Sequence, residues 1–217
     1  LDAAGFMTLY NESVRNSALG VGANNTYSTE DIAAYLDGTK QSYDWYGLAM
    51  NKIAPMHQHN LSASGGTEKV QYYISLGYLG QKGLASSGIQ EYQRWNLRSN
   101  LQAELLNGLK LNMNIAGMKD DSKGTAGSLG NIYKSMWRQL PMNSPYINGN
   151  SSMPYNGFDS VHPMVETDED LRGYSKNING KINATASLTY DFSLIRGMSI
   201  KALYSYEHRF VENRLFD

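Results

Sequence analysis

The chain has 217 residues, a net charge of −1, no cysteine and 18% charged residues, where an average globular chain carries about 25%. The near-neutral charge excludes a global attraction to nucleic acid, and the lack of cysteine excludes disulfides, thiol nucleophiles and cysteine-based zinc sites. Glycine (21 residues) and tyrosine (16 residues) are abundant, which favours antiparallel strands joined by polar turns.

Residues 1–55 are expected to form a loop region with short helices. Phe6, Leu9 and Val14 recur at helical spacing. Ser28 is placed to cap a second helix, with Asp31 three residues later as the acid of a capping box. The segment that follows is irregular and rich in aromatic residues.

Over residues 56–118 apolar and polar residues alternate, with a period of two. This pattern predicts four strands in two hairpins with tight turns near 65–69 and 106–108. Each strand has one apolar and one polar face. In the third strand, Trp95, Leu97 and Leu101 share the apolar face. The polar face of that strand carries Arg94, Asn96, Arg98 and Asn100.

Residues 119–178 predict a long loop with a helix near 127–140, which Pro141 ends. Ile132, Met136 and Trp137 lie on the apolar side of that helix, where packing against the loop is favoured for Trp137. Alternation resumes in a hairpin over 179–210, and 211–217 are expected to begin the next loop.

These features predict an all-β fold, namely an antiparallel membrane β-barrel segment whose long extracellular loops carry short helices. Strands of about 9–12 residues, short turns alternating with long loops, and aromatic residues near the ends of apolar faces are typical of outer-membrane barrels. The polar faces would then line a water-filled lumen, because arginine facing lipid costs roughly 2–4 kcal/mol near the midplane. The alternative is a soluble antiparallel sandwich.

Six strands are fewer than the roughly eight of the smallest single-chain barrels, so the sequence is expected to be a piece of a longer barrel. No segment reaches the roughly 20 apolar residues of a membrane helix.

Two runs resemble the early barrel of the SusC/RagA-type TonB-dependent transporters. They are HQHNLSASGGTEKVQYYISLGYLGQKG, from His57 to Gly83, and YQRWNLRSNLQAEL, from Tyr92 to Leu105. Asp44-Trp45 is similar to the "DW" that precedes the second barrel strand of this family, and the LTYDF run ending at Phe192 also resembles it. The likeness extends over nearly the whole chain.

The resemblance implies an outer-membrane importer of glycan or peptide fragments. In this family a barrel of about 22 strands is filled by an N-terminal plug. A SusD-like surface lipoprotein serves as a lid, and the TonB complex supplies energy. The plug, the TonB-contacting segment and the later strands are expected outside these residues. The alternative function is a soluble β-sheet glycan-binding module.

Aromatic residues of the loops are the best candidates for ligand binding, because their rings stack on sugars and on apolar peptide groups. The alternative for each is packing within the loops or against the lid. The candidates are Trp45, Tyr46, Tyr146, Tyr155 and Phe158.

Three further patterns have two interpretations each. Arg94 and Arg98 would bind an anionic ligand, or pair structurally with Glu104 or with carboxylates of the plug. His57 and His59 would be half of a metal site, although a place at the lipid interface is favoured for both. The acidic run at 166–170 suits a solvated loop better than a metal. The sequence therefore predicts no catalytic residues, no metal, no cofactor and no enzyme activity.

Overall fold

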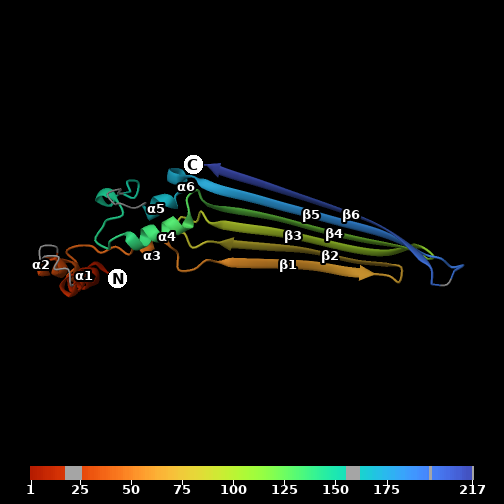
Figure 1. The fold of residues 1–217 in the computed structure, drawn as a ribbon, viewed down its shortest axis with the longest axis horizontal. Coiled ribbons are helices and arrows are strands. Elements are labelled where there is room, and N and C mark those ends of the chain that lie inside the picture. The colour runs from red at the N-terminus through yellow and green to blue at the C-terminus, as the bar shows by residue number, and fades with distance from the viewer. Residues whose placement is uncertain (18–25, 155–161, 196, 217) are drawn as a thin grey trace.

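A computed structural model of the chain describes residues 1–17, 26–154, 162–195 and 197–216. One six-stranded antiparallel sheet dominates it, and its strands follow one another in chain order, β1-β2-β3-β4-β5-β6. The described helices gather at one end of the strands and leave the length of the sheet uncovered (Figure 1). Among the described residues, no helix is both long and apolar enough to cross a bilayer.

The strands are long and increase in length along the chain. They are β1 Met56–Gly66, β2 Val70–Lys82, β3 Glu91–Leu106, β4 Leu109–Thr125, β5 Tyr174–Asp191 and β6 Ser199–Phe216. The helices are α1 Ala3–Asn16, α2 Thr29–Leu36, α3 Trp45–Ala49, α4 Leu129–Arg138, the 3-10 turn η2 Ile147–Gly149, α5 Pro163–Glu166 and α6 Glu169–Arg172.

Short and long connections alternate along the sheet, as the sequence predicts. Residues 67–69 and 107–108, and the described residues 192–195 and 197–198, lie in turns at the end remote from the helices (Figure 1). Gly108 adopts φ 81°, a left-handed conformation that suits glycine in so tight a turn. Residues 83–90, 126–154 and 162–173 lie at the helical end.

Three strand boundaries differ from the prediction, because β4 continues to Thr125, β5 begins at Tyr174 and β6 continues to Phe216. The predicted loops at 119–178 and 211–217 are therefore too long. In the first of these extra segments, the run from Lys119 to Lys123, both faces are polar. Backbone pairing persists without hydrophobic alternation there, with Thr125 still opposite Tyr174, so a period-based prediction ends the strand too early.

The packed core lies among the helices and not on the sheet. Ala49, Met50, Ile132 and Met136 form a buried cluster, against which Leu84 and Met164 pack. None of the buried hydrophobic residues of the described chain belongs to a strand. The sheet is thus a single layer whose faces need another environment to cover them.

The predicted helices form, with one difference in how a side chain is placed. Ser28 accepts a hydrogen bond from the Asp31 backbone at 3.0 Å and caps α2. Trp137 does not pack within the described loops, because its side chain is 85% exposed while Ile132 and Met136 are buried. Packing of Trp137 against the lid stays a prediction. Trp137 lies one helical position past Met136, which turns it away from the cluster.

Candidate functional site

The register of the sheet sorts its side chains into two chemically different faces. Leu61, Leu76 and Leu97 are register partners across β1, β2 and β3, so they share one face. Neighbouring Asn60 and Asn96 point to the other face, on either side of Gly77. The predicted division of β3 into an apolar and a polar side therefore extends coherently over its neighbours.

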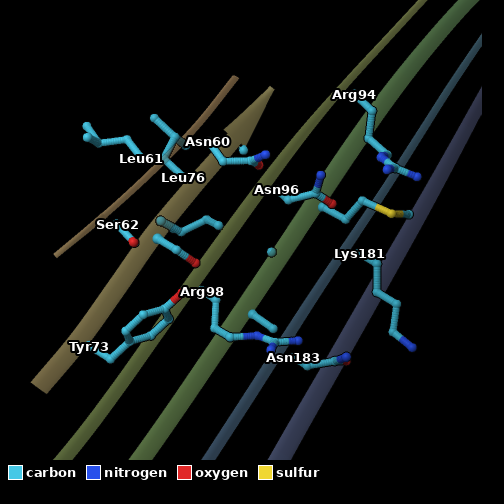
Figure 2. Close-up of a pocket in the computed structure, with 16 residues that line it drawn as sticks. Asn60, Leu61, Ser62, Tyr73, Leu76, Arg94, Asn96, Arg98, Lys181 and Asn183 are labelled. Atoms are coloured by element: carbon cyan, nitrogen blue, oxygen red, sulfur yellow. The ribbon is translucent and has the colours of Figure 1, made fainter. Parts of the chain in front are cut away.

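A hollow of about 580 Å³ lies on the polar face (Figure 2). Small side chains form its floor, because Ser75 and Ala116 are the register partners of Arg98 and Gly77 is that of Asn96. We call it the polar hollow. It is lined by Asn60, Leu61, Ser62, Tyr73, Ser75, Leu76, Gly77, Arg94, Asn96, Leu97, Arg98, Ala116, Gly117, Met118, Lys181 and Asn183.

The charged lining of the polar hollow is cationic. Arg94, Arg98 and Lys181 line it, and none of its lining residues is an aspartate or a glutamate. Lys181 pairs with Glu207 at 3.2 Å. Figure 2 shows Arg94 and Arg98 on one strand with Lys181 beyond them.

The opposite face carries an apolar band that ends in a row of aromatic rings. The rings of Tyr78 and Trp95 lie 4.5 Å apart, and the His59 ring stacks on Tyr78 at 6.4 Å. His57 also contacts Tyr78, at 5.5 Å between centroids. Both histidines thus lie with aromatic residues at the edge of the band. Within the described chain, no group of three potential metal ligands includes them.

Charges begin on this face at the level of the aromatic row, where Lys119 is the register partner of Trp95, and continue beyond it. Lys176 pairs with Asp121 at 3.1 Å, and Lys123 pairs with Glu169 of α6. The apolar face therefore has a sharp chemical boundary toward the helical end of the sheet.

The helical end is held together around Trp45 and His162. The Trp45 indole Nε1 donates to the Leu140 carbonyl at 3.1 Å, and its ring meets that of His162 edge to face at 5.3 Å. His162 Nε2 hydrogen-bonds the Pro145 carbonyl at 2.8 Å. Burial lowers the pKa of His162 below its ordinary value of 6.5. The structure therefore favours the packing interpretation for Trp45, which is 4% exposed.

The other aromatic candidates are placed differently. Tyr46 is 53% exposed beside the buried Trp45. Tyr146 lines a cleft of about 210 Å³ between the 83–90 connection and α5. Tyr155 and Phe158 lie outside the described residues. The structure brings Tyr46 and Tyr146 to the same end of the sheet but into different surroundings.

Comparison with known proteins gives one relative in sequence and several in fold. No protein-family model matches the chain. TonB-dependent receptor P26 of Formosa agariphila is 34% identical over 125 residues, which cover 57% of this chain and 11% of that protein.

The RagAB peptide importer in its closed-closed state superposes with a TM-score of 0.61 over 97% of this chain, at 20% identity. In sequence over 57% of its length and in fold over 97%, the chain is similar to SusC/RagA-type TonB-dependent transporters. The open-open state of the same importer gives a TM-score of 0.58 at 19% identity. The SusC/RagA-like chain spans 25% of each solved chain and 11% of the sequence relative.

The sequence predicts the polar face of β3 but does not predict which residues of other strands stand beside it. Lys181 and Asn183 of β5 line the polar hollow, although they lie far along the chain from Arg94. Alternation shows which side of a strand a residue faces. It does not show which residues of two other strands stand opposite, and that register is needed to find the hollow.

Proposed function

We propose that the chain forms part of the wall of an outer-membrane β-barrel in a TonB-dependent importer of glycan or peptide fragments. The apolar face of the sheet meets lipid, and the polar face lines the water-filled lumen. The helical end lies outside the cell, and the tight turns lie on the periplasmic side.

The exposed apolar band carries this proposal. Leu61 is 74% exposed, Leu97 42% and Tyr204 70%, and no helix covers the length of β1, β3 or β6 in Figure 1. From Gly180 in the aromatic row to Tyr190 near the turns, β5 rises about 34 Å at about 3.4 Å per residue. A tilt of about 45° reduces this to about 24 Å, close to the roughly 25 Å apolar band of outer-membrane barrels.

The free edges of the sheet support closure by further strands. In the described chain, β1 and β6 each have a single neighbour, so each presents a row of unpaired backbone groups. A barrel removes such edges, and only a closed sheet satisfies the backbone within lipid. Because the chain spans 25% of the RagAB chains that it resembles, further strands of the same protein are the natural partners.

The partners follow from the same likeness. The solved relatives are named as a peptide importer, and the family resemblance adds a SusD-like surface lipoprotein as lid and the TonB complex as the source of energy. In this arrangement Tyr46 and Tyr146, at the helical end, are placed to meet an incoming oligosaccharide or peptide. Tyr155 and Phe158 belong to the same proposed set, and no catalytic, metal or cofactor role is proposed.

Site-directed spin labelling of the full-length importer in lipid vesicles tests the orientation of the sheet. Labels replacing Leu97 and Leu101 should be relaxed by oxygen, which partitions into lipid. Labels replacing Asn96 and Asn100 should be relaxed by a water-soluble nickel complex. Lipid contact at positions 96 and 100 would refute the barrel wall.

The native size and location of the polypeptide provide an independent test. An antibody against residues 141–154 should detect an outer-membrane band several times larger than the 24.2 kDa of this chain. A 24.2 kDa band in the soluble fraction would instead favour the glycan-binding module.

A further inference from the structure

Ion pairs match only part of the positive charge that lines the polar hollow. Its three charged lining residues are Arg94, Arg98 and Lys181, and of these only Lys181 makes an ion pair within the described chain. The Nε atom of Arg94 is buried and has no hydrogen-bond acceptor among the described residues. A guanidinium group left in this state lacks part of the stabilisation that an acceptor supplies.

The nearby carboxylates of the described residues make no ion pair with Arg94 or Arg98. Asp120 is the register partner of Arg94, yet its Oδ1 accepts a hydrogen bond from Asn179 Nδ2 at 2.9 Å. Glu207 is held by Lys181 at 3.2 Å. Glu104, once a sequence-based candidate to pair with the arginines, stands opposite Lys110 near the turns. The two arginines are therefore available to a carboxylate from outside these strands.

The surroundings suit an anion attached to a polar molecule. Gly77 opens the floor, since a Cβ there would come within 2.9 Å of Asn60 Oδ1. Asn60, Asn96 and the Tyr73 side chain line the hollow and offer neutral donors and acceptors for hydroxyl or amide groups. The planar fork of arginine binds a carboxylate through two parallel hydrogen bonds, which gives geometric selectivity as well as charge.

We propose that the polar hollow is a binding site for the carboxylate groups of the imported solute, held by Arg94 and Arg98. The proposal rests on the proposed function, because the polar face must line the path of the solute. In that position, two arginines without carboxylate partners raise the local concentration of acidic oligosaccharides or acidic peptides over neutral ones.

The test is calorimetric binding to the full-length importer in detergent, using two matched pairs of probes. Trigalacturonate is compared with its methyl ester, and a glutamate-containing peptide with its glutamine counterpart. Arg94→Gln and Arg98→Gln should each lower the affinity for the acidic probe about 10- to 100-fold, which corresponds to the loss of one charge-assisted hydrogen bond. The affinity for the matched neutral probe should change about threefold at most. Arg98→Lys should recover only part of the affinity, because it keeps the charge and loses the fork.

Lys201→Gln is the matched control, since it removes one positive charge from the same face outside the polar hollow. The affinity of this variant for both probes of each pair should stay within about twofold of that of the unaltered protein, because an exposed charge more than a Debye length away is screened. Equal losses for acidic and neutral probes, together with a lower unfolding temperature without probe, would assign the arginines to a carboxylate of the protein itself and overturn the proposal. Failure of the unaltered importer to bind either acidic probe up to about 10 mM would also overturn it.

These outcomes are separable from failure of the proposed function. If the spin labels at positions 96 and 100 contact water while the acidic probes show no preference, the barrel wall stands and the carboxylate site falls. If those labels contact lipid, the barrel wall falls.

Discussion

The ring of Phe210 lies over Gly180, its register partner on the apolar face, and fills the space where a side chain would stand. A Cβ built on Gly180 would overlap that ring. Phe210 therefore stands at the same level of the sheet as Tyr78 and Trp95, with Lys119 of β4 and Gly180 of β5 between them in the register. An aromatic ring over a strand glycine also shields the exposed backbone.

Gly180→Ala should destabilise the folded protein by about 1–3 kcal/mol, because the added methyl group displaces the Phe210 ring. Gly124→Ala is the matched control, since no atom lies within 4 Å of a Cβ at that strand position. The measurement is the temperature at which the folded protein converts to its slower-migrating form on a detergent gel. Equal shifts for both variants would contradict the packing seen here.

Arginine substitutions at adjacent positions of β3 should differ strongly in cost. Leu101→Arg places a charge on the apolar face near the middle of the band, where lipid contact costs about 2–4 kcal/mol. Asn100→Arg places the same charge on the polar face. The yield of folded protein in the outer membrane and its unfolding in urea should separate the two variants, whereas similar behaviour would argue against lipid on the apolar side.

The loops around His162 should loosen as the pH falls. Burial lowers the pKa of His162 below 6.5, so the unfolded loop binds a proton more readily than the folded one. Stability from this residue is complete above about pH 6.5. Below that pH it falls, by about 1.4 kcal/mol in total for each unit by which the pKa is lowered. Hydrogen exchange over residues 162–167, corrected for intrinsic rates, should increase from pH 8 to pH 5.5.

His162→Asn should remove this pH dependence, because asparagine can donate to the Pro145 carbonyl without titrating near neutral pH. His59→Asn, in the aromatic row of the sheet, serves as the control and should leave the dependence in place. An unchanged pH profile in His162→Asn would show that another group controls the loops.

Trp45 and Tyr46 should respond differently to substitution although they are neighbours. Trp45→Phe removes the hydrogen bond to the Leu140 carbonyl and should lower the free energy of unfolding of the helical end by about 1–3 kcal/mol. Tyr46→Ala should leave stability within about 0.5 kcal/mol, because Tyr46 is 53% exposed. If Tyr46 stacks on the incoming solute, binding to the full-length importer should weaken. Loss of binding only in Trp45→Phe would reverse the two roles.

The sequence by itself determined the strands wherever one face is apolar. The alternation around Leu97 and Leu101 identified the faces of β3, and Ser28 with Asp31 marked the start of α2. These signals are local, because the side-chain period of a strand and the cap of a helix depend only on nearby residues. Where both faces are polar, as at Lys119 to Lys123, the local signal disappears and the strand ends were wrong.

Only the tertiary structure decided which strands face one another and in what register. That register brings Lys181 to Arg94 and Arg98, engages Asp120 with Asn179, and lays Phe210 over Gly180. It also buried Trp45 at the helical end and left Trp137 exposed, although both are aromatic residues of predicted loops. The physical reason is that burial and pairing depend on residues distant in sequence, whereas composition and period report only on neighbours along the chain.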